Sequence, residues 1–223
     1  MFKIPINKIK FPPVFLANSQ GLLGYGGDLS PERLIEAYKN GIFPWNTANE
    51  DILWWAPDPR MVLFPNEVKI SKSMRSLMRK NKYSLTENKA FEEVIRQCAI
   101  SNNRQGKDAW LYDEMIEAYT QLHHLGYAHS VEVWNKEGKL VGGLYTVQVL
   151  PHIISGESMF HLESNTSKLA FIHLAKTSEE KGIKVIDCQI YTPHLASMGA
   201  KPIPRDVFMD ILYGANEEVD DEE

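Results

Sequence analysis

The chain has little cysteine and no long apolar run, and each shortage excludes a class of protein. Cys98 and Cys188 are its two cysteines, and no C-x-x-C pair occurs. This excludes a disulfide-rich scaffold and a cysteine zinc site. No stretch approaches the ~20 apolar residues of a membrane-spanning helix. The first residues alternate apolar and basic side chains without a continuous signal-peptide core. We therefore expect a cytoplasmic protein with no membrane partner.

The histidines lack the spacing of a metal site. Seven histidines are scattered along the sequence, and neither H-x-x-x-H nor H-E-x-x-H occurs. We therefore expect no bound metal.

The net charge is small and uneven. The formal charge is −5, and removing the six acids of the last seven residues leaves a body of about +1. An acidic total therefore does not exclude an anionic partner for the body. The acidic tail, 215–223, is expected to be disordered.

Composition divides the chain near residue 58. Residues 1–58 are rich in Gly, Pro and Trp, and they predict one helix, capped by Ser30, begun by Pro31 and ended by Gly41. The rest of this part is expected to be ordered loop packed by aromatic residues. The Pro57-Asp58-Pro59 segment marks the boundary, because residues before proline avoid the helical region.

Residues 59–214 alternate between helix and strand patterns, which predicts an α/β (α+β) domain with a mixed sheet. The expected helices lie at 71–81, at 112–125, at 167–181 and at 204–212, and a further helix is capped by Asn88. The expected strands lie at 61–64 and 184–188, in a hairpin of 128–134 with 140–148, and in a strand that ends near Gly156.

One helix is strongly basic. Six basic residues and no acid occur between Lys69 and Lys82, and Lys72, Arg75 and Arg79 share a helical face. A solvated surface helix and a helix that binds phosphates both fit this pattern. The tryptophans in loop contexts, which include Trp45 and Trp110, fit core packing or stacking on a nucleobase.

Two acidic segments follow predicted strands. Glu157 lies in Gly156–Phe160, and Asp187 lies in Ile186–Gln189. Strand ends in α/β folds often bind ligands, so an acid/base role is open. A structural cap or ion pair fits the spacing better. Strand alternation points Cys188 away from Asp187 and Gln189, which predicts a buried, unreactive thiol.

Several unusual segments resemble one protein family. The sequence resembles the bacterial leucyl/phenylalanyl-tRNA–protein transferases over about Gly21 to Gly199, in the segments GLLGYGGDLSPERLIEAYKNGIFPW, ILWWAPDPR, ISKSM, LGYAHSVEVW, LVGGLY, SGESMF, SNTSK and IDCQ. The resemblance implies a small N-terminal domain packed on a catalytic domain related to the GNAT acetyltransferases.

The resemblance also implies an activity. The family transfers Leu or Phe, and less well Met, from aminoacyl-tRNA to a protein or peptide with an N-terminal Arg or Lys. The new N-terminus then marks that protein for degradation as an N-degron. Because the donor ester is already activated, no cofactor, ATP, metal or covalent intermediate is implied.

The resemblance implies roles for individual residues, group by group. These are catalytic residues (Asp187, Gln189, Glu157), aromatics for the 3′-terminal adenosine (Trp45, Trp110), a donor side-chain pocket (Leu144, Ser158, Met159, Phe160) and a basic cluster for the tRNA backbone (Lys72, Arg79, Lys80). Ser76 replaces an expected basic residue of that cluster, and Arg75 on the same face compensates.

A mechanism follows for the catalytic group. Asp187 is expected to fix Gln189, whose amide oxygen accepts a hydrogen bond from the attacking amine. Glu157 or Asp187 would meet the charge of the acceptor. Two alternatives stay open: another GNAT-type aminoacyl or acyl transferase, and a tRNA-binding module without enzymatic activity.

Overall fold

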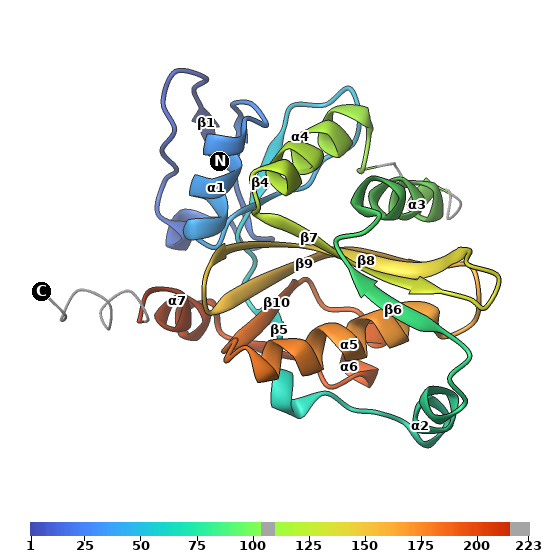
Figure 1. The fold of residues 1–223 in the computed structure, drawn as a ribbon. Helices are drawn as coiled ribbons and strands as arrows, with labels where there is room; N and C mark the ends of the chain where they lie inside the picture. Colours follow the sequence, from blue (N-terminus) through green and yellow to red (C-terminus); the bar gives the residue numbers. More distant parts are fainter. Residues whose placement is uncertain (104–109, 215–223) are drawn as a thin grey trace, which may run out of the picture.

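The computed structural model describes residues 1–103 and 110–214, so the expected tail at 215–223 lies outside the described residues. A four-stranded sheet has the order β1-β2-β4-β3 and a seven-stranded sheet the order β11-β5-β10-β9-β8-β7-β6 (Figure 1). The small sheet contains β1 (Phe2–Ile4), β2 (Leu22–Gly26), β3 (Phe43–Pro44) and β4 (Leu53–Trp55). The large sheet contains β5 (Arg60–Leu63), β6 (Ser84–Glu87), β7 (Ala128–Trp134), β8 (Leu140–Leu150), β9 (Ile153–His161), β10 (Val185–Gln189) and β11 (Lys201–Ile203).

Helices cover both faces of the large sheet. The α-helices are α1 (Pro31–Lys39), α2 (Lys72–Arg79), α3 (Phe91–Asn103), α4 (Asp113–His124), α5 (Thr166–Glu180), α6 (Pro193–Ser197) and α7 (Arg205–Tyr213), with 3-10 turns η1 (Val14–Leu16) and η2 (Pro65–Glu67). Helices α3 and α4 lie on one face, and α5 and α6 lie on the other (Figure 1). No helix in the described ranges is long and apolar enough to cross a membrane.

The large sheet is mixed. Strand β10 pairs in parallel with β9 and antiparallel with β5. The remaining pairs of this sheet are antiparallel, including the predicted hairpin of β7 and β8. The prediction of an α/β fold with a mixed sheet is therefore confirmed. The domain boundary at residue 58 stays a prediction, because one apolar cluster runs from Leu34 and Trp54 of the N-terminal part to Phe91 and Tyr119 of the helical layer.

The N-terminal part contains more regular structure than the sequence indicated. The expectation of ordered loop around one helix is wrong, because strands β1 to β4 form a sheet there. These strands have two to five residues, too few for a readable alternation. Gly24 allows β1 to approach, since a Cβ there would lie 2.7 Å from the carbonyl oxygen of Phe2. The helix predicted to begin at Pro31 is confirmed as α1, but the expected cap is wrong, because the Ser30 side chain makes no capping hydrogen bond and donates to Asp28 instead.

The large domain differs from the predictions in several details, since β6, α6 and β11 were not expected. Strand β9 does not end near Gly156 but continues to His161, because it pairs with the longer β8 as far as Gly142. Asn88 does not cap α3, since it exchanges hydrogen bonds with Ser130 of β7. The buried carboxylate of Glu132 instead accepts from the backbone N–H groups just before α3.

Candidate active site

Strands β9 and β10 separate in the middle of the large sheet. Their parallel pairing ends at Asp187 opposite Ser155. Each strand then carries one extra residue relative to its antiparallel neighbour: Glu157 on β9 and Cys188 on β10. Such bulges break the alternation of a strand and redirect its side chains. Past these bulges both strands line a pocket of about 570 Å³.

The pocket has three kinds of lining. Aromatic and proline side chains stand at one side (Phe43, Pro44, Trp45, Trp110), apolar side chains form a wall (Leu144, Met159, Phe171, Leu174, Leu195), and polar side chains complete it (Glu157, Ser158, Gln189, Thr192, His194). Trp45 is 42% exposed, so its ring is available to a ligand. The indole N–H of Trp55 donates to the carbonyl oxygen of Trp45 at 2.7 Å, which fixes the backbone that carries this ring.

The structure brings most of the expected site residues into this pocket. Trp45, Trp110, Leu144, Glu157, Ser158, Met159 and Gln189 line it. Phe160, which follows Met159 on β9, does not line the pocket. Its ring faces the opposite side of the sheet and is 1% exposed in the core. Asp187 also lies outside the lining. The basic residues of α2 form a separate surface.

Asp187 is buried in an ion pair. Its two carboxylate oxygens accept from Arg60, with Nε–Oδ1 at 2.8 Å and Nη2–Oδ2 at 2.6 Å, and both side chains are 2% exposed. The Arg60 guanidinium lies over the rings of Phe43 and Phe208 at 4.9 and 4.8 Å. Arg60 thus neutralises Asp187 and holds it at the back of the site.

Asp187 positions the backbone of Gln189. Its Oδ1 accepts from the Gln189 backbone N–H at 2.9 Å. Gln189 has φ of 63°, a left-handed conformation that residues with a side chain seldom adopt. The expected alternation around Cys188 is therefore wrong, because this turn and the bulge place both Cys188 and Gln189 on the pocket.

A carboxylate fixes the orientation of the Gln189 amide. Its Nε2 donates to Glu157 Oε1 at 3.0 Å. The ionised carboxylate of Glu157 only accepts, so with it the NH₂ group faces Glu157 and the amide oxygen faces the other way. Among the described residues no donor is recorded for that oxygen. Gln189 therefore presents an oriented acceptor.

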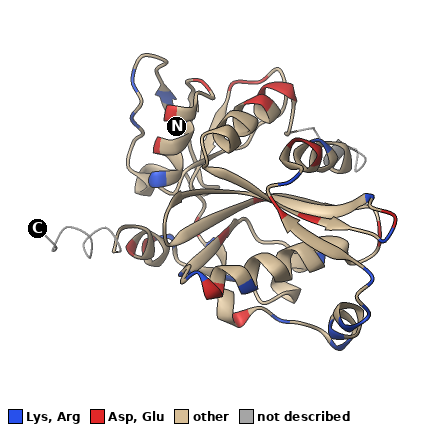
Figure 2. Ribbon diagram, viewed as in Figure 1, with Lys and Arg blue, Asp and Glu red and all other residues tan. Residues whose placement is uncertain are grey.

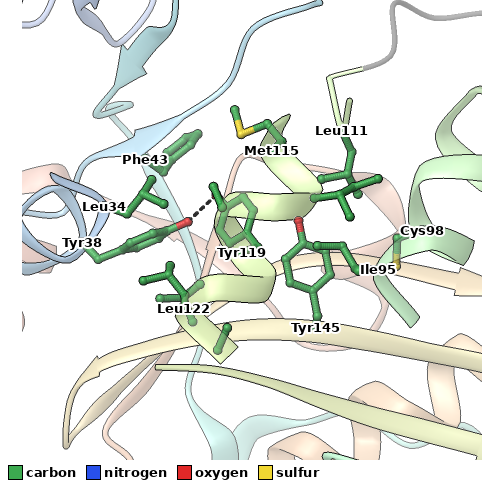
Figure 3. Packing of buried hydrophobic residues seen from close by; sticks show 14 of the residues in the cluster. Leu34, Tyr38, Phe43, Ile95, Cys98, Leu111, Met115, Tyr119, Leu122 and Tyr145 are labelled. Atoms are coloured by element: carbon green, nitrogen blue, oxygen red, sulfur yellow. Dashed lines mark hydrogen bonds between the residues drawn. The ribbon is translucent and has the colours of Figure 1, made fainter. Parts of the chain in front are cut away.

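Two buried tyrosines hold Glu157. The hydroxyl of Tyr119 donates to Glu157 Oε2 at 3.3 Å and lies 2.7 Å from the hydroxyl of Tyr38 (Figure 3). Burial raises the pKa of Glu157 to about 7, and the charge of Asp187 contributes in the same direction. Hydrogen bonds from Tyr38, Gln189 and Tyr119 oppose the shift. Glu157 therefore changes charge near neutral pH.

The basic residues lie on α2, away from the pocket lining. Ser71 caps this helix by accepting from the backbone N–H of Met74 at 3.2 Å, and Met74 is its buried anchor. Lys72, Arg75, Arg79 and Lys80 are exposed. None of them forms an ion pair within residues 1–103 and 110–214. Helix α2 appears as a concentrated basic element (Figure 2).

Comparison with known proteins identifies the family. A family model described as leucyl/phenylalanyl-tRNA protein transferase matches residues 62–213, and the model of its N-terminal domain matches residues 27–58. The chain is 52% identical over 202 residues to a leucyl/phenylalanyl-tRNA–protein transferase of Syntrophobacter fumaroxidans, covering 91% of this chain and 86% of that one. The chain belongs to the leucyl/phenylalanyl-tRNA–protein transferase family.

A second relative and two solved structures are also similar to the chain. A leucyl/phenylalanyl-tRNA–protein transferase of Flavobacterium johnsoniae is 53% identical, over 91% of this chain and 94% of that one. Among solved structures, FemX has a TM-score of 0.47 at 10% identity, over 78% of this chain and 66% of that one. A GNAT-family acetyltransferase of Staphylococcus aureus has a TM-score of 0.37 at 15% identity, over 47% of this chain and 70% of that one. The family assignment rests on the sequence matches.

Membership makes this transferase an enzyme that moves an aminoacyl group, with aminoacyl-tRNA and protein as the substrates in the family's name. Within the described residues, no group of three or more His, Cys, Asp or Glu side chains is arranged to hold a metal ion. Of the polar side chains that line the pocket, Glu157 and Gln189 are hydrogen-bonded to each other.

Three residues that organise the site are absent from the sequence-based predictions. Arg60 lies in the ILWWAPDPR segment without a predicted role, and Tyr38 and Tyr119 lie on the buried faces of α1 and α4. A signal was available for the tyrosines: a hydroxyl on a buried helix face needs a hydrogen-bond partner. Nothing in the spacing indicated that Arg60 meets Asp187, which is 127 positions away.

The raised pKa of Glu157 predicts a pH-dependent effect of Glu157→Gln in this transferase. A carboxyl group whose pKa is raised in the folded state lowers the stability of the protein as pH rises through that pKa. Above about pH 7 we therefore expect Glu157→Gln to have a higher Tm than the wild type. The difference should shrink toward pH 4.5, the ordinary value for this carboxyl.

Thermal unfolding across this pH range measures the effect. Glu117→Gln on α4 is the matched control, since Glu117 is exposed and should show no pH-dependent difference. A Tm difference for Glu157→Gln that is independent of pH would contradict the raised pKa of Glu157.

Proposed function

We propose that the chain transfers Leu or Phe, and less well Met, from aminoacyl-tRNA to the α-amine of an N-terminal Arg or Lys. The product is a new peptide bond, and the modified protein becomes a substrate of N-degron degradation. The observation that carries the proposal is the Gln189 amide, oriented by Glu157 at 3.0 Å within a pocket of apolar and aromatic walls. Family membership supports transfer from tRNA to protein.

The donor fits the two sides of the pocket. Trp45 and Trp110 would hold the terminal adenosine by stacking, which binds bases through their faces. The apolar wall, which includes Leu144, Met159 and Phe171, would take the donor side chain. Such a wall rejects polar side chains but distinguishes apolar ones weakly, since one methylene contributes only ~1–3 kcal/mol. Acceptance of Leu, Phe and Met follows.

The reaction needs positioning more than acid or base strength. The neutral amine attacks the ester carbonyl carbon, a C–N bond forms, and the bond to the 3′-oxygen of the tRNA breaks. Gln189 Oε1 accepts a hydrogen bond from the amine and directs its lone pair to the carbonyl. The proton that the amine loses ends on the leaving 3′-oxygen. Orientation of this kind can contribute ~7–11 kcal/mol to the rate.

Glu157 is the acid that would meet the charge of the acceptor. Asp187 is already paired with Arg60 behind the site, whereas Glu157 lines the pocket. A cationic side chain nearby favours the carboxylate form of Glu157. An acceptor that begins with Arg or Lys would therefore bind better than one that begins with an acidic residue.

Direct transfer tests the function. Purified protein is mixed with radiolabelled Leu-tRNA and peptides that start with Arg, with Glu, or with acetylated Arg. We expect label on the free-Arg peptide only, because the α-amine is the nucleophile. Equal labelling of unrelated amines would favour another aminoacyl transferase. Tight tRNA binding with no transfer would favour a binding module.

Helix α2 predicts a salt-dependent part of tRNA binding. Removing one phosphate contact, as in Arg79→Gln, should weaken binding of any aminoacyl-tRNA and reduce the slope of log affinity against log salt by about 1. Filter binding over a salt series measures this slope. The control is Lys39→Gln on α1, an exposed cation in the N-terminal part. Equal slopes for the two variants would remove α2 from the tRNA surface.

A further inference from the structure

A second cavity shares Leu174 with the apolar lining of the main pocket. Its volume is about 160 Å³. Thr177 and Ser178 of α5 line it on one side, and Thr146 of β8 and Ile154 of β9 line it on the other. Leu174, which is 7% exposed, lines both this cavity and the main pocket.

The two cavities follow one another along the same elements. On α5 the main pocket takes Phe171 and Leu174, and the second cavity takes Leu174 and Ser178, which are spaced by three and four residues on one helical face. On β8, Leu144 and Thr146 are two residues apart and share a face of the sheet. The second cavity therefore continues the line of the apolar wall.

Most of the lining of the second cavity is polar or charged, and it includes the exposed Glu87–Lys181 ion pair. The Ser178 side chain is 1% exposed, and among residues 1–103 and 110–214 its hydroxyl oxygen has no hydrogen-bond partner. Thr146 contributes a second hydroxyl, with one contact of 3.5 Å to the carbonyl oxygen of His129. A buried hydroxyl without a partner is unfavourable, and a polar atom of a ligand would satisfy it.

We propose that the second cavity is an extension of the donor side-chain pocket, closed by Leu174. Leu174 then sets the length of the donor side chain, and the extension takes side chains longer than Phe that end in a hydrogen-bonding group. This rests on the proposed function in one respect, that the apolar wall receives the donor side chain.

Binding of donor analogues to the full chain tests the extension. The probes are adenosines with an aminoacyl group on a 3′-amide: phenylalanine, 4-propylphenylalanine and 4-(2-hydroxyethyl)phenylalanine. In Leu174→Ala, the Kd of each long probe divided by the Kd of the phenylalanine probe should be at least about tenfold lower than in the wild type. A ratio within one preparation does not depend on the fraction of folded protein.

Leu169→Ala is the matched control. Leu169 lies on the same helix, is 5% exposed, and lines neither cavity. Its ratios should equal those of the wild type. If Leu174→Ala does not fold, Leu174→Val should shift the ratios in the same direction by a smaller factor. Unchanged ratios in the Leu174 variants, or an equal shift in Leu169→Ala, would overturn the proposal.

The Ser178 hydroxyl has a test of its own. Ser178→Ala, added to Leu174→Ala, should weaken the hydroxyethyl probe severalfold and leave the propyl probe unchanged. Equal effects on both probes would overturn the polar assignment. Transfer is assayed separately with the natural donors. Wild-type protein that binds the phenylalanine probe but transfers nothing would contradict the proposed function, while the Kd ratios would still report on the extension.

Discussion

Replacing Arg60 by alanine is expected to remove both stability and transfer. Asp187, which is 2% exposed, would lose its cation. Breaking a buried ion pair from one side destabilises a protein by about 3–5 kcal/mol. Without Arg60 the carboxylate would no longer be fixed in position. The hydrogen bond that it accepts from the Gln189 backbone N–H at 2.9 Å would therefore be weakened. Denaturant unfolding and the transfer assay measure the two losses.

Two further variants separate stability from positioning. Arg205→Ala removes a guanidinium that donates to the carbonyl oxygen of Ala56 at 2.7 Å but leaves no buried acid, so it should cost only about 0.5–1.5 kcal/mol. The double variant Arg60→Met/Asp187→Leu should regain most of the stability, since apolar side chains can replace a buried ion pair. It should not regain transfer. Full activity of the double variant would show that Asp187 does not position Gln189.

Replacing Gln189 by alanine is expected to lower kcat by about 10²–10⁴, because the oriented acceptor for the amine is lost. The KM for aminoacyl-tRNA should change little, since Trp45, Trp110 and α2 are untouched. Gln189→Glu should be at least as damaging, because it brings a second carboxylate against Glu157, now 3.0 Å from the amide nitrogen. Steady-state kinetics with Leu-tRNA and an Arg peptide measure both variants.

Exchanging the two groups tests orientation directly. In Glu157→Gln/Gln189→Glu, the new amide at 157 can accept from Tyr119 and donate to the new carboxylate at 189. The hydrogen bond between the two positions is restored in the opposite direction. We expect at least about a tenfold gain in kcat over Gln189→Glu alone, as one hydrogen bond to a charged group contributes ~1.5–3 kcal/mol. No gain would mean that the Gln189 oxygen is not used as an oriented acceptor.

Local sequence patterns predicted many of the helices and strands. Pro31 predicted the start of α1, and the alternation in 128–134 and 140–148 predicted the β7–β8 hairpin, because helix starts and strand alternation depend on near neighbours. The small N-terminal sheet escaped prediction. Its strands are too short for a pattern, and β1 reaches β2 across the 17 residues between Ile4 and Leu22.

Contiguous motifs were enough to identify the family, the mixed α/β class and the segments that meet at the pocket. How those segments act on one another depends on the three-dimensional arrangement. Because of the bulges at Glu157 and Cys188, both strands line one pocket, and Phe160 lies in the core. Arg60 neutralised Asp187 and left Glu157 as the acid of the pocket. These outcomes depend on strand register and on contacts between residues far apart in the chain, and spacing along a sequence carries neither.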